Sequence, residues 1–355
     1  MLPELCLALA VAGLTAYAVL GGADFGAGFW DLTAGGAKRG GGVRGMVQHS
    51  MGPVWEANHV WLIFVLVLMW TCFPTAFGSI FSTLYVPLFI VVIGIIFRGT
   101  AFALRGQAAT IGEARFIGAI FATSSVLVPF CFGACLGAIA SGRVPVGNAA
   151  GDPISSWLSP TGVLVGALAV VTGAYLAAVY MAGDSVRTGL PDLARAFRAR
   201  ALIAGGLAGA IAIGGLAVLH DDARSLFDGL TSGGGLAFVI ASAVAGGTTL
   251  LLVWRERYEI ARFSAATAVA CVTIGWAFAQ SPYVLPERLT LDQAAAPDAT
   301  LVASLIGVAA GLVVLVPSLY LLYSLTLRGR LDQEYEPLDQ RFTPLAGDKR
   351  AGGGT

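Results

Sequence analysis

Nine long apolar stretches constrain the fold of this chain more than any other feature of its sequence. A helix needs about 20 apolar residues to cross the hydrocarbon core of a bilayer. The apolar residues in these stretches do not alternate with the period of two that strands of a membrane barrel would show. The sequence therefore predicts an all-α, polytopic integral membrane protein with nine transmembrane helices. The predicted spans are residues 5–30, 54–73, 78–98, 116–140, 160–182, 201–219, 234–253, 263–281 and 300–325.

The charge content excludes several classes of protein. Only 12% of the 355 residues are charged, against about 25% in a soluble domain, which excludes an ordinary cytoplasmic enzyme. Lys+Arg and Asp+Glu are both 21, so there is no basic excess of the kind a nucleic-acid-binding protein uses. The 47 glycines follow no Gly-X-Y period and favour closely packed helices in a membrane.

The basic residues lie mostly in alternate loops, and this predicts the orientation. Arginine and lysine near membrane spans are retained on the cytoplasmic side. With the N-terminus outside, 18 of the 21 basic residues lie inside, and only Arg143, Arg224 and Arg288 lie outside. We therefore expect residues 1–330 to form a single transmembrane domain with its C-terminus inside. The first stretch has no basic segment before it and is expected to be a retained helix.

The last segment of the chain differs from the rest. Residues 331–355 are polar, contain two prolines and end in a run of glycines. Such a composition cannot bury enough apolar surface to fold by itself. We expect this segment to be a mobile cytoplasmic tail.

An acidic residue lies inside the first predicted span. Asp24 is flanked by Gly22 and Gly26, a spacing of small residues that lets another helix backbone approach closely. An acid at this depth needs a partner or a water-filled path. The alternative is that Asp24 is an interfacial acid beside a packing motif.

The second predicted span begins with an unusual cluster of polar side chains. Trp55, Glu56, Asn58 and His59 fall within five residues after Pro53. Residues three or four apart share a helix face, so His59 can share a face with Trp55 and with Glu56. An aromatic belt at the membrane surface would explain Trp55 and Trp61, but it gives no reason for the acid, the amide and the imidazole.

A basic residue ends the third predicted span on the same side of the membrane. Alternating helix directions bring Arg98 to the depth of Asp24 and Glu56. A guanidinium can keep one carboxylate ionised, while burial raises the pKa of another. The three groups therefore suggest a point of proton uptake on the cytoplasmic side. The alternative for Arg98 is that its side chain extends to the membrane surface, as arginines at helix ends commonly do.

The sequence offers no haem or metal site of its own. The three histidines are His49 in an inside loop, His59, and His220 at an outer helix end. There is no Cys-x-x-Cys-His attachment site, phosphate-binding loop or zinc-ligand spacing. Cys131 and Cys135 share a helix face, and we interpret them as packing residues.

These motifs together resemble subunit II of the cytochrome bd-type quinol oxidases. The run from Gly22 to Gly28 is similar to that family's Gly-Phe-Asp-x-Gly-x-Gly. The run from Pro53 to Leu62 is similar to its Pro-x-Trp-(Asp/Glu)-x-Asn-x-Val-Trp-Leu. The pairs Phe73-Pro74 and Phe97-Arg98 also occupy corresponding places, with Tyr85 between them. The specific part of the resemblance covers about the first 105 residues.

The resemblance implies a function in aerobic respiration. It implies a partner, subunit I, that carries haems b and d and oxidises quinol, so that this chain binds no haem firmly. Its helices would form two four-helix bundles with one peripheral helix, and a structural quinone is held by some members. The implied location is the bacterial cytoplasmic (inner) membrane, in contact with lipid and with no nucleic-acid partner.

By the same resemblance, Asp24, Trp55, Glu56 and Arg98 match positions associated with proton conduction. His59 lies where other members carry a neutral amide and adds a group that titrates near neutrality. Two acids are missing: Gly21 and Ile117 occur where many members carry a carboxylate. The path would then depend on Glu56 and water, or take another course.

Three hypotheses follow. The first is a non-haem, proton-conducting subunit of a quinol:oxygen oxidoreductase that is not catalytic alone. The second is a secondary transporter, since nine spans with buried acids also suit that class. The third is a purely structural assembly subunit whose acids only fix helix contacts.

Overall fold

The computed structural model describes residues 1–51, 55–105, 107–108 and 110–327. Within these residues, nine helices are long and apolar enough to cross a membrane, as predicted. They are α1 (Leu2–Leu32), α3 (Trp55–Cys72), α5 (Tyr85–Leu104), α6 (Ile111–Ala140), α7 (Pro160–Arg187), α8 (Pro191–Asp222), α10 (Gly233–Trp254), α11 (Tyr258–Gln280) and α13 (Asp298–Leu327). The expected tail, 331–355, and the start of the second motif, 52–54, lie outside the described residues.

The third span lies further along the chain than predicted. Instead of a helix over 78–98, the structure has a short helix α4 (Pro74–Thr83) followed by α5. Leu84 separates them with backbone angles of φ −100° and ψ 25°. In a continuous helix Pro87 would remove a hydrogen bond to residue 83. At the third position of a new helix it removes none, because the first turn has no intrahelical acceptors for its N–H groups.

Several loops contain secondary structure that the sequence did not reveal. Helix α2 (Ala37–Met51) follows the first span and includes His49, which we expected in a loop. Helix α9 (Arg224–Thr231) lies between α8 and α10. Two strands, β1 (Tyr283–Leu285) and β2 (Leu289–Thr290), form a small antiparallel hairpin before α12 (Leu291–Ala294). Their buried leucines, Leu285 and Leu289, join the apolar cluster at this end of the bundle.

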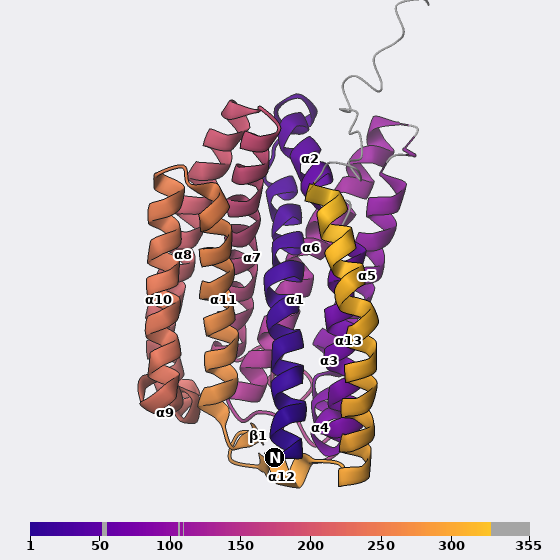
Figure 1. The fold of residues 1–355 in the computed structure, drawn as a ribbon, viewed down its shortest axis with the longest axis vertical. Helices are drawn as coiled ribbons and strands as arrows, with labels where there is room; N and C mark the ends of the chain where they lie inside the picture. The colour runs from indigo at the N-terminus through magenta and orange to yellow at the C-terminus, as the bar shows by residue number, and fades with distance from the viewer. Residues whose placement is uncertain (52–54, 106, 109, 328–355) are drawn as a thin grey trace, which may run out of the picture.

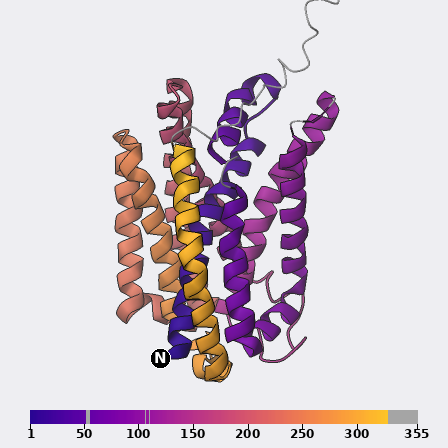
Figure 2. The same ribbon diagram turned by 45° about the vertical axis from the view of Figure 1, so that its right-hand side comes forward.

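Helix α1 lies in the middle of the assembly (Figure 1) and contacts α3, α6, α7 and α11. Helix α5 packs on α6, α7 packs on α8, and α10 packs on α11. Helix α13 lies at the side, against α3 and α1, and the rotated view in Figure 2 shows it on the outside. Because α6 and α7 also share a long contact, the division into two four-helix bundles stays a prediction.

Glycines allow the close contact between α6 and α7. A Cβ atom at Gly133 would lie 2.5 Å from the carbonyl oxygen of Val165, and one at Gly137 would lie 2.6 Å from that of Thr161. Neither distance leaves room for a side chain. The two helices therefore approach backbone to backbone, as small residues permit in membranes.

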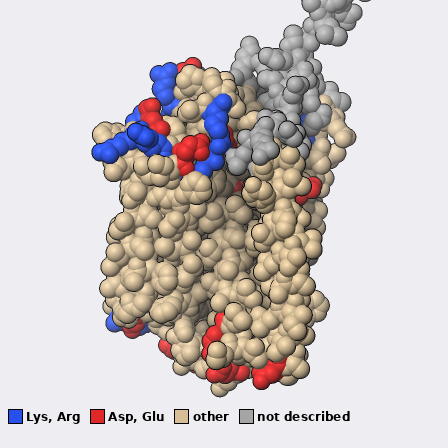
Figure 3. Space-filling model, viewed as in Figure 1, with Lys and Arg blue, Asp and Glu red and all other residues tan. Residues whose placement is uncertain are grey.

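Charged side chains gather at the two ends of the molecule, with a largely uncharged surface between them (Figure 3). We call the end that holds the α7–α8 and α10–α11 connections the arginine-rich end; it carries Arg187, Arg195, Arg198, Arg255 and Arg257. Between the ends, large apolar side chains such as Trp70, Phe89 and Val313 are exposed. This is the surface pattern of a membrane protein. The side of the membrane that the arginine-rich end faces stays a prediction.

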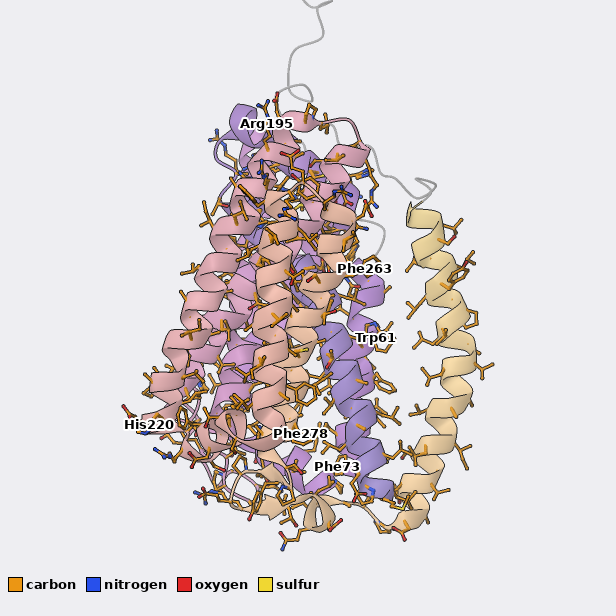
Figure 4. All side chains as sticks on the ribbon, turned by 60° about the vertical axis from the view of Figure 1, so that its left-hand side comes forward. Trp61, Phe73, Arg195, His220, Phe263 and Phe278 are labelled. Atoms are coloured by element: carbon orange, nitrogen blue, oxygen red, sulfur yellow. The ribbon has the colours of Figure 1, made fainter. Side chains whose placement is uncertain are left out.

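An open apolar groove of about 810 Å³ separates α13 from α3. On α13 it is lined by small residues, among them Ala303, Gly307 and Gly311, and on α3 by Phe64 and Leu68. Figure 4 shows α13 beside the other helices rather than among them.

Candidate functional site

A fully buried ion pair joins the first and third spans. Asp24 of α1 is 0% exposed and Arg98 of α5 is 2% exposed. Arg98 Nη1 donates to Asp24 Oδ2 at 3.0 Å, and Nη2 donates to Oδ1 at 2.8 Å. Asp24 is eight residues before the end of α1, or about 12 Å along the helix at 1.5 Å per residue. The alternative of an arginine extending to the surface is therefore wrong, and the depth of Asp24 in the membrane stays a prediction.

Arg98 makes four hydrogen bonds within the described part of the chain and has aromatic neighbours. Its Nε donates to Ser125 Oγ of α6 at 3.0 Å, and Nη2 also donates to the carbonyl oxygen of Asp24 at 3.0 Å. The guanidinium carbon lies 4.8 Å from the ring centre of Phe25 and 4.9 Å from that of Phe121. Pairing and hydrogen bonding of this kind are required to hold a charge in an apolar interior.

A second acid, Asp31, anchors the arginine-rich end of α1. Its Oδ1 accepts from Arg44 Nε of α2 at 2.8 Å, and its Oδ2 accepts from Arg105 Nη2 at 2.5 Å. The Arg105 guanidinium lies 5.2 Å from the centre of the Phe121 ring, which Arg98 also contacts. Sequence reasoning missed this group. The sequence did contain a signal. Asp31 follows Asp24 by seven residues and Arg105 follows Arg98 by seven residues, and residues seven apart lie on the same face of a helix, two turns along.

The start of α3 places His59 against the first span. The Nδ1 atom of His59 lies 2.9 Å from the carbonyl oxygen of Trp55. The His59 ring makes edge contacts with the rings of Trp55, Phe25 and Tyr17, at centroid distances of 6.3, 6.1 and 6.1 Å. Trp55 and His59 therefore share one face of the helix, as their spacing predicted. Next to them, buried Asn58 donates to the carbonyl oxygen of Leu20 at 3.4 Å.

Glu56 lies apart from the buried ion pair. Its side chain is exposed on α3, while Asp24 and Arg98 are enclosed between α1, α5 and α6. The structure thus brings two of the three expected charged groups into contact and leaves the third at the surface of the chain. His59, three residues further along α3 and partly buried, lies between these two environments.

Tyr17 is a polar group in this region that the sequence analysis did not select. It is buried on α1, and its hydroxyl has no hydrogen-bond partner among the described residues. Its ring also meets Phe132 of α6 at a centroid distance of 5.8 Å. Tyrosine is common in apolar cores, so only the packing around it could reveal this hydroxyl.

The three histidines lie on three different helices. His49 is in α2, His59 is in α3, and His220 is exposed at the end of α8 beside Asp221. Figure 4 shows His220 near the end of the molecule opposite Arg195. Among the residues that the structure describes, no group of three or more His, Cys, Asp or Glu could hold a metal ion. Cys131 and Cys135 are buried.

A comparison with known protein families shows the family to which this chain belongs. The family model for cytochrome bd terminal oxidase subunit II matches residues 2–326. The chain belongs to this family. It is therefore a multi-pass membrane protein of a family named for subunit II of a terminal oxidase. This match favours the first of the three hypotheses over the transporter.

Individual relatives agree with the family match. Cytochrome bd ubiquinol oxidase subunit 2 of Bacillus subtilis (strain 168) is 29% identical over 90 residues, which are 25% of this chain and 27% of that protein. The alignment thus spans about a quarter of that relative's length. The structure of bd oxidase from Geobacillus thermodenitrificans contains a chain with a TM-score of 0.72 and 23% identity. The match covers 92% of this chain and 98% of that chain, which shows that the fold is shared.

Proposed function

We propose that this subunit II packs against a haem-bearing subunit I and supplies a proton path from the cytoplasm to the site of oxygen reduction. The haems b and d and the oxidation of quinol belong to the partner. The chain itself makes and breaks no bonds of the substrates. Its carboxylates and imidazole take up and pass on hydrogen ions, and the location is the bacterial inner membrane.

The observation that carries this proposal is that the ionisable side chains become more buried along the first turn of α3. Glu56 is exposed, and His59 is partly buried one turn further on. The ring of His59 contacts Phe25, which is adjacent in α1 to the buried Asp24. Ionisable groups inside a membrane protein are costly and commonly mark proton or ion routes. Here they lead from the surface of the chain toward its interior.

The buried ion pair has a different task in this proposal. Asp24 and Arg98 pair with each other and are held in place by several hydrogen bonds. Their contribution is to join α1 to α5 and to set the electrostatic potential in which a nearby proton moves. Glu56 is then the group that takes up protons, since its carboxylate is accessible.

A structural quinone is a further expectation from the resemblance. The groove between α3 and α13 supports it, because its lining is apolar and its volume of about 810 Å³ has room for an isoprenoid tail. Extraction of the purified complex with organic solvent, with and without a Gly307→Leu substitution that fills the groove, tests this expectation. Equal quinone content in both preparations would contradict it.

The central experiment replaces Glu56 in the two-subunit complex. We expect Glu56→Gln to lower oxygen consumption with quinol by at least about tenfold, because assisted proton transfer contributes factors of that order or more. Glu56→Asp keeps the carboxylate and should retain much of the rate. Glu113→Gln, a change of an exposed acid in the first turn of α6, is the matched control and should be neutral.

Haem absorbance of the co-purified complex is measured in parallel. If Glu56→Gln assembles with normal haem bands and normal turnover, the proton path fails and the purely structural hypothesis is favoured. If the chain purifies without a haem-bearing partner, the assignment to a two-subunit oxidase fails.

A further inference from the structure

Near the buried ion pair, two aromatic rings that contact each other each carry a buried polar atom without a hydrogen-bond partner among the described residues. The hydroxyl of Tyr17 and the Nε2 atom of His59 are both buried, and neither has a partner among the described residues. The two rings meet edge to face, with centroids 6.1 Å apart and an interplanar angle of 67°. Buried polar groups are nearly always hydrogen-bonded, so two orphans in adjacent rings require an explanation.

The chemistry of His59 defines what it can do. A backbone carbonyl only accepts hydrogen bonds, so the 2.9 Å contact with Trp55 places the hydrogen on Nδ1. In the neutral ring Nε2 then carries a lone pair and no hydrogen. Histidine is also the side chain whose ordinary pKa lies closest to neutral pH. The buried Nε2 atom is therefore a proton acceptor.

Tyr17 presents the complementary group. A phenol both donates and accepts a hydrogen bond. The ring lies along α1 over Gly21, where an added Cβ would be 2.8 Å from Tyr17 Cε2. The absence of a side chain at Gly21 thus lets the ring extend along α1 in the direction of Asp24.

The groups around His59 allow its ring to carry a positive charge transiently. Phe25 separates His59 from Arg98, whose guanidinium lies 4.8 Å from the centre of the Phe25 ring. Since Arg98 is paired with Asp24, its charge is compensated. The remaining ring contacts of the two side chains are Trp55 and Phe132, which carry no charge. A proton arriving at His59 therefore meets no uncompensated like charge from these neighbours.

We propose that His59 and Tyr17 form a proton relay inside this subunit, a step that rests on the proposed function and adds two residues to it. A hydrogen ion from the Glu56 side binds Nε2 and gives the imidazolium, while the Nδ1 hydrogen stays on the Trp55 carbonyl. Because Nε2 and the Tyr17 oxygen do not hydrogen-bond to each other directly, a bridging water carries the Nε2 hydrogen to the Tyr17 oxygen, and the phenol gives its own proton to a further water on the way to the partner subunit. One proton enters and one leaves, with no electron transferred.

The relay is tested in the complex with its partner subunit. The reduced complex is mixed with oxygen in weak buffer, and a pH-indicator dye reports proton uptake while haem absorbance reports oxidation. We expect His59→Gln to slow proton uptake about tenfold or more, since an amide cannot accept the proton. Tyr17→Phe, which removes one oxygen atom, should slow it several-fold.

The matched control is Trp61→Phe. Trp61 is on the same helix, and its Nε1 is also buried without a partner among the described residues, but it makes no ring contact with His59 or Tyr17 in the pairs above. Its loss should leave uptake unchanged. Haem spectra must be normal in all three variants, which separates a relay from a folding defect.

The outcomes distinguish this inference from the proposed function. If Glu56→Gln slows proton uptake and His59→Gln does not, the path exists and bypasses the relay, so the relay is overturned. If neither variant slows uptake, both proposals fail. Slow uptake in His59→Gln with a normal rate in Tyr17→Phe overturns the part assigned to Tyr17. Should His59→Gln fail to assemble, the rate of Tyr17→Phe alone decides.

Discussion

Gly26 of α1 and Gly173 of α7 cross in direct backbone contact. A Cβ atom placed on Gly26 would lie 1.9 Å from the carbonyl oxygen of Gly173, and one placed on Gly173 would lie 2.6 Å from that of Gly22. The small-residue spacing of Gly22 and Gly26 therefore does what its pattern predicted. The crossing is also what brings the segment with Asp24 into the centre of the helix assembly.

Replacing Gly26 by alanine should separate α1 from α7. No side chain can give way, because the obstruction is backbone, and overpacking of this kind costs about 1–3 kcal/mol or more. We expect a lower midpoint of thermal unfolding for the purified complex in detergent. Gly246→Ala on α10, where a Cβ would meet nothing within 4 Å, is the control, and an equal loss in both variants would contradict the proposed crossing.

Breaking the Asp24–Arg98 pair should be among the most destabilising single changes in the chain. Removal of one partner leaves an uncompensated buried charge, at a cost of about 3–5 kcal/mol. We therefore expect Arg98→Leu to reduce the yield of assembled complex severely, and the double variant Asp24→Leu/Arg98→Leu to recover part of it. The comparison is Asp228→Asn, which breaks an exposed pair with Arg224 and should cost less than about 1 kcal/mol. A milder effect for Arg98→Leu than for Asp228→Asn would refute this interpretation.

Asp31 should determine the stability of α2. It binds Arg44 of α2 and Arg105, which follows α5, so Asp31→Asn weakens two ion pairs with one change. Hydrogen–deuterium exchange of peptides from 37–51 should accelerate, because α2 loses an attachment to α1. Asp192→Asn, which removes only an exposed pair within α8, should leave that exchange unchanged. Unaltered exchange in Asp31→Asn would show that α2 is held by apolar packing alone.

The orientation of the chain is open to chemical labelling. If the arginine-rich end faces the cytoplasm, a cysteine at Arg195 should react with a membrane-impermeant maleimide only after the cells are opened. A cysteine at Asp152, which is exposed in the α6–α7 connection, should react in intact cells. The unmodified chain is the background control, since four of its cysteines are buried and Cys271 is partly buried. The reverse pattern would invert the predicted topology.

Local signals made some of these features predictable and left others hidden. Hydropathy depends on a residue and its neighbours in sequence, so the nine spans were predictable. The bounds of the third span were wrong, because the helix containing Pro87 begins at Tyr85. Spacing along one helix correctly related Trp55 to His59. The contact of Asp24 with Arg98 was expected only as a shared depth in the membrane. The roles of Asp31 and Arg105 were not expected, because a pairing between helices depends on how each helix is rotated.

The sequence by itself determined the class of the protein, its number of spans and the family to which it belongs, because these depend on composition, length and short motifs. Only the tertiary structure decided that Glu56 is exposed while Asp24 is enclosed, and that the rings of Tyr17 and His59 meet edge to face between α1 and α3. The physical reason is that burial depends on which face of a helix meets a neighbour. That face is fixed by backbone contacts such as the one between Gly26 and Gly173, which join residues far apart in the chain.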